Sequence, residues 1–196
     1  MTPPDGNLPE PLLHWRAHHI LLCSSTYLGK GYTPSYTANL DALMARINAA
    51  PEGVDVKLVD GPDDWCRPLL QGKDDASKAH QQHCLHPSTT ERDARARADL
   101  APFLGYEPQA GSIITLNAEL VREFRKAFWR STHAKQTGKA KEYTAPRTGC
   151  HACSWSSLCD EVARRVYPEV KLLPQAVPSK VFPVVLVAGL HTPTAA

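Results

Sequence analysis

The sequence predicts a mainly α-helical α+β protein of about five helices with one or two short strands, stapled by a cysteine-ligated metal cluster. Three observations lead to this prediction. Several stretches repeat apolar residues at helical spacing, whereas the short stretch Val54–Val59 alternates apolar and polar residues as strands do. The third observation is a run of three closely spaced cysteines, Cys150 to Cys159, which is typical of a metal site.

The first two predicted helices lie on either side of a glycine-rich turn. Leu12–Tyr27 carries apolar residues at near-helical spacing, and Gly29-Lys30-Gly31 interrupts the pattern. Thr33-Pro34 is a capping and first-turn pair, which opens a second helix that runs to about Ala49.

The middle of the chain is expected to hold a strand, a loop and a helix. Val54–Val59 is the predicted strand. Gln71–Gln82 is polar, so we expect a surface loop there. The Ser-Thr-Thr-Glu sequence at 88–91 is a helix start, and that helix is expected to end at about Leu104.

The C-terminal half is expected to hold two further helices. Ile113-Ile114 is a second short extended piece, and an asparagine-capped helix covers Ala118 to about Ser131. His133–Gly149 is basic, polar and without periodicity, which predicts a long loop. Ser156–Tyr167 is the last predicted helix, with Cys159 in its first turn.

The organisation predicted is one cysteine-ligated domain over residues 12–173, with Pro-rich extensions at 1–11 and 174–196. Hydrophobic residues make up 42% and charged residues 21%, as in ordinary globular proteins. The N-terminus lacks a signal-peptide pattern, and the strongest apolar run, Phe182–Leu190, is about half the length of a membrane helix. We therefore expect a cytoplasmic protein without a membrane span, whose thiols stay reduced.

Cys150, Cys153 and Cys159 form a C-x2-C-x5-C run with Trp155 inside it. Two thiolates two residues apart can hold one metal from a tight turn, and the third can return from the following helix. Three converging thiolates suit iron–sulfur chemistry or zinc. The chain has six cysteines, and in a reducing compartment they point to metal rather than to disulfides.

A fourth ligand has to come from another part of the chain. Cys66 follows the exit from the predicted strand, and Cys84 lies in a histidine-rich stretch, so both are favoured. With the C-terminal three they make five candidates for four places. Cys23 is the reserve, because it shares a helical face with His19 in a pair that is more often found packed in a core.

The donor set favours an iron–sulfur cluster, with 4Fe–4S preferred over 2Fe–2S. Structural zinc is the alternative, because zinc accepts the same ligands. The cysteine spacing with one distant upstream cysteine also resembles the iron–sulfur staple of RecB-type nucleases and the auxiliary-cluster domains of radical-SAM enzymes. The catalytic residues of those enzymes are not evident in this sequence.

Charge and catalytic patterns bear on possible partners. The segment Arg122–Arg147 holds eight basic and two acidic residues in a chain of net charge +2, which predicts one basic face. We expect this face to dock a protein partner, with nucleic acid as the alternative.

No catalytic set stands out, although a small-molecule site lined by His18, His19 and Asp64 is a third hypothesis. Phe182–Leu190 could also clasp a second subunit.

Several motifs together resemble one family. They are Arg16-Ala17-His18-His19 leading to Cys23, Gly29-Lys30-Gly31-Tyr32, Val59-Asp60-Gly61-Pro62-Asp63-Asp64-Trp65-Cys66, Cys84, Glu91-Arg92-Asp93, and Cys150-x2-Cys153-x-Trp155-x2-Leu158-Cys159. Over Leu13–Leu173 the chain resembles the bacterial and archaeal domain-of-unknown-function family 1284. The resemblance implies a single-domain cytoplasmic protein with a cysteine-held iron–sulfur cluster and no defined reaction. Some members carry a further cysteine where this chain has Leu69.

Overall fold

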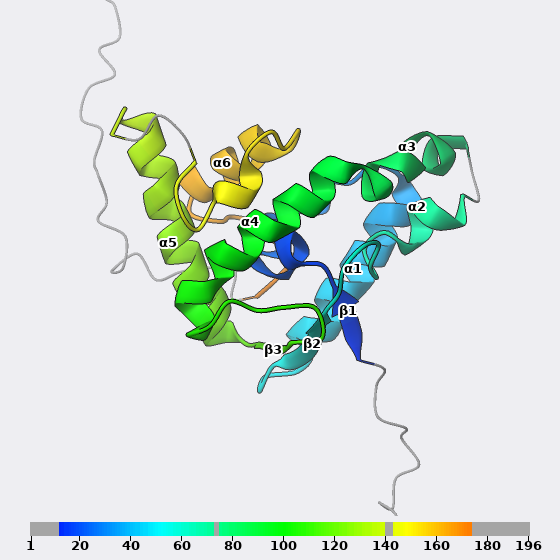
Figure 1. The fold of residues 1–196 in the computed structure, drawn as a ribbon, viewed down its shortest axis with the longest axis horizontal. Coiled ribbons are helices and arrows are strands. Elements are labelled where there is room, and N and C mark those ends of the chain that lie inside the picture. The colour runs from blue at the N-terminus through cyan, green and yellow to red at the C-terminus, as the bar shows by residue number, and fades with distance from the viewer. Residues whose placement is uncertain (1–11, 73–74, 140–142, 174–196) are drawn as a thin grey trace, which may run out of the picture.

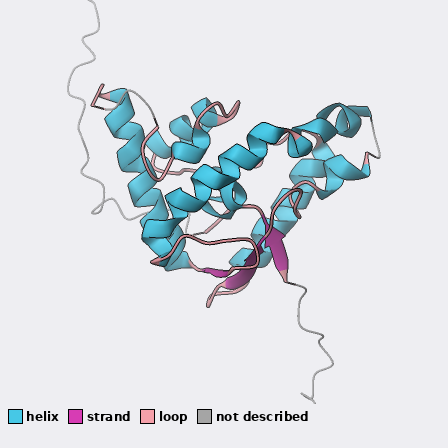
Figure 2. Ribbon diagram, in the orientation of Figure 1, coloured by secondary structure: helices cyan, strands magenta, loops and turns pink. Residues whose placement is uncertain are grey.

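The computed structural model describes residues 12–72, 75–139 and 143–173. Within these ranges the chain forms six α-helices, one π-helical segment, two 3-10 turns and a three-stranded sheet (Figures 1 and 2). The mainly helical α+β prediction is confirmed, with a third strand that was not expected. The predicted extensions, including Phe182–Leu190, lie outside the described residues.

The small sheet is mixed and closes one end of the molecule. β1 (Leu13–Trp15) pairs in parallel with β2 (Val54–Leu58), and β2 pairs antiparallel with β3 (Ile113–Leu116). The predicted strand at 54–59 and the extended piece at 113–114 are therefore both confirmed. Because β1 pairs in parallel with β2, the residues that follow Trp15 run directly into the buried interior of the protein.

The prediction of a single helix over Leu12–Tyr27 was wrong at its start. Leu13 and Trp15 are buried and His14 between them is exposed, which is the two-residue period of a strand. Further on, the chain forms the π-helical segment η1 (His19–Cys23) and the 3-10 turn η2 (Ser24–Thr26). Figure 1 shows η1, in blue, near the centre of the molecule and behind α4.

The other predicted helices are present with shifted ends. They are α1 (Pro34–Asn48), α4 (Pro87–Leu104), α5 (Ala118–Gln136) and α6 (Ser156–Arg164). Thr33 caps α1 and Asn117 caps α5, as expected, by accepting backbone N–H groups. His86 caps α4 in place of the predicted threonine. α6 stops early because Val166 and Tyr167 adopt left-handed backbone angles.

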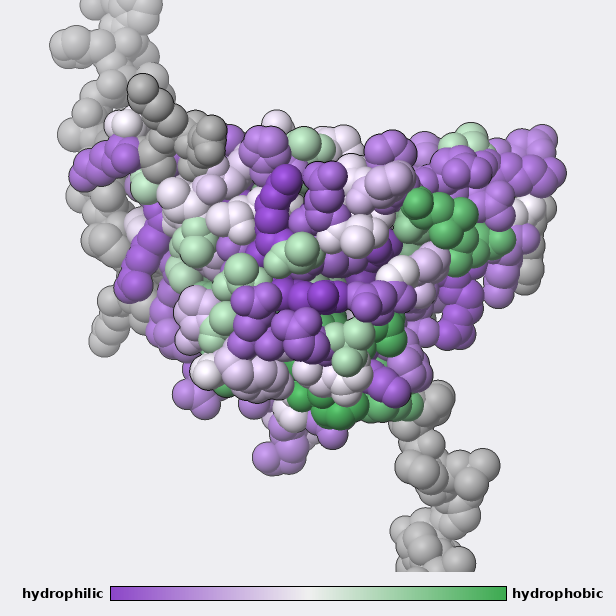
Figure 3. Space-filling view, in the orientation of Figure 1, coloured by the Kyte–Doolittle hydropathy of each residue, from purple (hydrophilic) through white to green (hydrophobic). Residues whose placement is uncertain are grey.

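Two predicted loops are partly helical. α2 (Arg67–Gln71) and α3 (Asp75–Leu85) occupy most of the segment expected as a surface loop. α3 buries only Ser77 and Cys84, so its sequence carries no apolar periodicity. Likewise, α5 runs five residues beyond its predicted end into the expected basic loop. The face drawn in Figure 3 is mostly hydrophilic, including much of the end where α3 lies.

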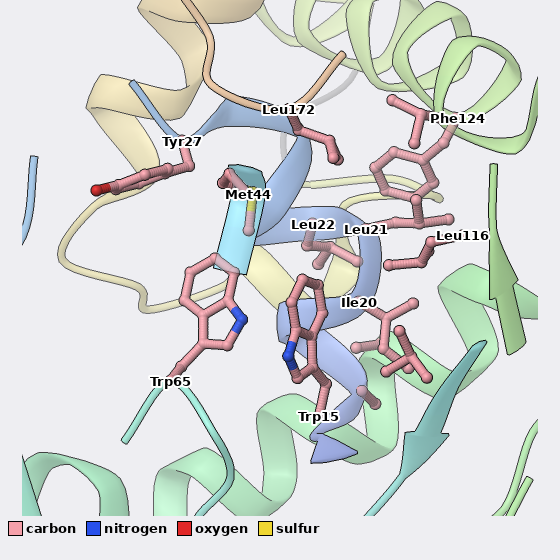
Figure 4. Close-up of a cluster of buried hydrophobic side chains, with 14 of the residues drawn as sticks. Trp15, Ile20, Leu21, Leu22, Tyr27, Met44, Trp65, Leu116, Phe124 and Leu172 are labelled. Atoms are coloured by element: carbon pink, nitrogen blue, oxygen red, sulfur yellow. The ribbon is translucent and has the colours of Figure 1, made fainter. Parts of the chain in front are cut away.

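A cluster of buried hydrophobic side chains surrounds η1 (Figure 4). Ile20, Leu21 and Leu22 come from η1 itself and are fully or almost fully buried. Trp15 and Trp65 meet edge to face beside them, with ring centroids 5.4 Å apart. Such an aromatic pair adds about 0.5–1.5 kcal/mol beyond its buried area. The core therefore fixes η1, the segment that carries the paired histidines and Cys23.

The basic segment Arg122–Arg147 forms a smaller basic face than its composition predicts. Arg125 is buried and donates hydrogen bonds to two backbone carbonyls. Arg147 is also buried, pairs with Asp160 and lies over the ring of Phe128. In the described part of the chain, no helix is long and apolar enough to cross a bilayer.

Gly149 allows the 3-10 turn η3 (Thr148–Cys150) to approach η1 and α4 closely. A Cβ atom at Gly149 would lie only 2.9 Å from Cδ2 of Leu22. Asp99 of α4 stabilises this close contact between η3 and α4. Its carboxylate accepts hydrogen bonds from the N–H of Gly149 at 2.8 Å and from the hydroxyl of Thr148 at 2.9 Å. This contact places the first cysteine of the C-terminal run against η1.

We predict that Gly149→Ala destabilises the fold by about 1–3 kcal/mol, because the added methyl group overpacks a contact that is already tight. Urea unfolding followed by circular dichroism measures the free energy of unfolding. Ser154→Ala is the control, since Ser154 is exposed in the same segment, and it should change that free energy by less than about 0.5 kcal/mol. Equal unfolding curves for the two variants would contradict the prediction.

Candidate metal centre

All six cysteines of the chain line one cavity of about 100 Å³. The cavity lies among η1, α2, α3, α4 and the segment that leads into α6. The predicted ligands line it together with the reserve cysteine; they are Cys23, Cys66, Cys84, Cys150, Cys153 and Cys159. Segments far apart in the sequence thus bring every thiol to the same place.

Four of these thiols form one group. Burial raises the pKa of Cys23, and the neighbouring thiols of Cys153, Cys159 and Cys150 raise it further. Burial likewise raises the pKa of Cys150 to about 12. The hydroxyl of Thr26 donates a hydrogen bond to Sγ of Cys159 at 3.2 Å, which ties η2 to α6. Cys23, the reserve of the sequence analysis, is therefore the thiol that joins the C-terminal three.

Cys66 and Cys84 form a second group in the same cavity. Both side chains are buried, and the two thiols interact with each other. The interaction with Cys84, followed by burial, raises the pKa of Cys66, whereas the interaction with Cys66 lowers the pKa of Cys84. Cys66 lies at the N-terminus of α2, and Cys84 lies near the end of α3.

The π-helical turn brings two histidines to Cys23. A π-helix has between four and five residues per turn, so residues four and five apart share a face, and His18 lies on the same side as Cys23. His19 is four residues before Cys23 and lies on that side too. One ligand atom from each of His18, His19 and Cys23 lies within 4.8 Å of the other two, so these residues form a possible metal-binding group.

Each histidine is held by a buried aspartate. Nδ1 of His18 is 2.6 Å from the carboxylate of Asp93, and Nδ1 of His19 is 2.7 Å from that of Asp63. Burial alone would raise the pKa of Asp93, but the hydrogen bond and charge of His18, with the charge of Arg16, bring it down to about 2. Burial lowers the pKa of His18 to about 3. His18 is therefore neutral and donates its Nδ1 proton, which leaves a lone pair on Nε2.

Asp63 organises the turn that follows β2. Its carboxylate accepts the backbone N–H groups of Arg16, Trp65 and Cys66 as well as the proton of His19. Asp64 is not among the cavity-lining residues, so the hypothesis that places it there beside the histidines was wrong. Its carboxylate instead accepts the N–H of His14 and pairs with Arg67.

An aromatic cover lies over the cavity. The indole N–H of Trp155 donates to the hydroxyl of Tyr32 at 2.9 Å, and that hydroxyl is 2.8 Å from Nε2 of His83. Burial lowers the pKa of His83 to about 4, so its neutral ring accepts the hydroxyl proton. The three side chains link the loop after η2, α3 and the C-terminal cysteine run.

Arg92 lines the cavity, and no counter-ion for it is found in the part of the chain that the structure describes. Its residue exposure is 9%, and its Nε has no hydrogen-bond partner among the described residues. Its charge acts on Cys23, Tyr32 and His83. A buried guanidinium that lacks an anionic partner is costly, which points to an anion in the cavity. In the sequence, Arg92 stands within Glu91-Arg92-Asp93, where no local signal indicates a role for it.

Comparison with known proteins gives one match. The family model described as "Protein of unknown function (DUF1284)" matches residues 31–159, which is more than half of the chain. The matched range includes five of the six cysteines. It begins after His18, His19 and Cys23, so these three residues lie outside it. No curated protein and no solved structure matches the chain.

We predict that Asp63→Asn destabilises the protein by about 2–4 kcal/mol, because its new NH2 group meets buried donors that need an acceptor. Asp60→Asn in the same turn is the matched control; the Asp60 side chain is 68% exposed and pairs with Arg97 at the surface. That control should cost less than about 1 kcal/mol. Chemical unfolding of both variants measures the difference, and equal losses would contradict the assigned role of Asp63.

Proposed function

This chain belongs to the family of proteins of unknown function DUF1284, and we propose that it binds an iron–sulfur cluster, 4Fe–4S in type, through Cys23, Cys150, Cys153 and Cys159. The observation that carries the proposal is the grouping of these four thiols in one cavity. Four thiolates are the usual ligand set of such a cluster. The proposed role is electron transfer or cluster-linked regulation with a protein partner.

The surroundings of the four thiols fit a cluster. A 4Fe–4S centre with four thiolates carries net negative charge, and the unpaired guanidinium of Arg92 supplies a buried positive charge beside it. Leu22 and Leu158 line the same cavity and keep its wall apolar. The hydroxyl of Thr26 already donates to the sulfur of Cys159, and hydrogen bonds to cluster sulfurs tune the reduction potential.

When bound, a 4Fe–4S cluster supplies one-electron transfer. Tyr32, Trp155 and His83 line the cavity and hold one another by hydrogen bonds. Their proposed role is to limit the access of water to the cluster. The exposed residues His151, Ala152 and Ser154 lie in the cysteine run itself. We therefore place the docking site of the partner at this segment, where the cluster would be nearest to the surface.

Serine variants test which thiols are ligands. We predict that Cys23→Ser and Cys153→Ser remove most of the iron, the acid-labile sulfide and the visible absorption of anaerobically purified protein. Wild type should contain about four iron and four sulfide per chain. Cys66→Ser is the matched control and should retain the chromophore, because its thiol is paired with Cys84.

The opposite pattern, in which Cys66→Ser is colourless and Cys23→Ser is brown, would restore the ligand set favoured by the sequence. A colourless wild-type protein with about one zinc in the four-thiol group, and no sulfide, would favour a structural zinc module instead.

The charge of Arg92 provides a second test. We predict that Arg92→Gln makes the reduction potential of the cluster more negative by tens of millivolts, because a buried cation favours the reduced, more negative state; about 59 mV corresponds to a tenfold change for one electron. Arg95→Gln on the same helix is the control, since Arg95 is 41% exposed and pairs with Glu91. Spectroelectrochemical titration measures both potentials. An equal potential in all three proteins would contradict the role of Arg92.

A further inference from the structure

Five histidine and cysteine side chains remain in the cavity once the cluster has its ligands. One of them, His83, is engaged through its Nε2 with the hydroxyl of Tyr32. The other four are His18, His19, Cys66 and Cys84. We propose that these four bind a second metal centre, a single zinc ion, beside the cluster. The inference goes beyond the proposed function and uses none of the four cluster ligands, so either centre can be present without the other.

The two histidines are oriented to bind metal through Nε2. Each Nδ1 faces an aspartate carboxylate, which accepts hydrogen bonds when ionised, so Nδ1 is occupied as a donor. Each Nε2 is the nitrogen left for a metal, and neither has a hydrogen-bond partner among the described residues. His18 and His19 are 3% and 8% exposed and line the cavity. A carboxylate behind an imidazole is the usual arrangement around a histidine that binds zinc.

The two thiols are tied to the same supports as the histidines. Asp63 holds His19 through its side chain and Cys66 through its backbone N–H. The ring of Trp65 stacks on that of His19, with centroids 4.4 Å apart. Arg16 links Cys84 to His18. Its side chain donates one hydrogen bond to the backbone carbonyl of Cys84 and another to Asp93, the aspartate that holds His18.

Two imidazoles and two thiolates are a standard tetrahedral ligand set for structural zinc. Cys66 and Cys84 line the same cavity and are close enough to shift each other's pKa, so one ion could bind both thiols. Cys23 lies between the two centres, since it is near both histidines and near the C-terminal thiols. We assign Cys23 to the cluster because three thiols surround it, whereas Cys66 and Cys84 have only each other. The zinc ion would then join η1 to α2 and α3.

Metal analysis of full-length protein tests the second centre. We expect wild type, purified anaerobically from zinc-supplemented cells, to contain about one zinc per chain in addition to its iron. His19→Gln and Cys84→Ser should lose the zinc and keep iron, sulfide and visible absorption. His14→Gln is the matched control, because His14 is exposed and outside the cavity, and it should keep both metals. Cys153→Ser should lose the iron and retain the zinc.

Cobalt gives an independent readout in wild-type protein. Replacing zinc by Co²⁺ should produce the visible bands of a tetrahedral site with thiolate ligands, and Cys84→Ser should abolish them. Wild type without zinc, or with zinc that persists in both His19→Gln and Cys84→Ser, would overturn the second centre. Loss of zinc in Cys23→Ser with retention in Cys84→Ser would also overturn the assigned ligands. Absence of iron alone would contradict the proposed cluster and leave the zinc result intact.

Discussion

Two buried carboxylates, those of Asp63 and Asp93, hold the centre of this structure together. Between them they bind Arg16, both neighbouring histidines and several backbone N–H groups. The two acids come from a turn after β2 and from α4. They bind Arg16 and His18, which lie between β1 and η1, and His19, which begins η1. Each buried charge is satisfied by several hydrogen bonds, which is the condition under which such networks specify one arrangement. The histidine rings are therefore fixed before any ligand arrives.

The cavity itself is costly for the protein to maintain. It gathers six thiols, two imidazoles and a guanidinium whose Nε has no partner among the described residues. Burial raises the pKa of several of these thiols, so they stay protonated and weakly bonded. Packing apolar side chains there instead would be more favourable. This local sacrifice of stability is characteristic of a binding site rather than of a core.

Most helices and the three cysteines of the C-terminal run could be predicted from the sequence. The periodic spacing of apolar residues, the helix caps and the spacing of the cysteines are all signals carried by neighbouring residues. Cys23 could not be placed with them. Its role depends on a π-helical turn, and nothing in the apolar pattern of Leu12–Tyr27 distinguishes that turn from an α-helix. α3 was missed because it buries only two side chains, so its sequence shows no repeating apolar face that would indicate a helix. Asp63 and Arg92 acquire their roles only from neighbours distant in the chain.

The walls of the cavity also impose an order on biosynthesis. The hydroxyl of Thr26 meets the sulfur of Cys159 across 133 residues, so the site cannot close until nearly the whole described chain has left the ribosome. A nascent chain that ends before α6 would expose Cys23, the two histidines and the second thiol pair to any available metal or oxidant. A ligand that needs the complete cavity can therefore bind only after α6 has been synthesised.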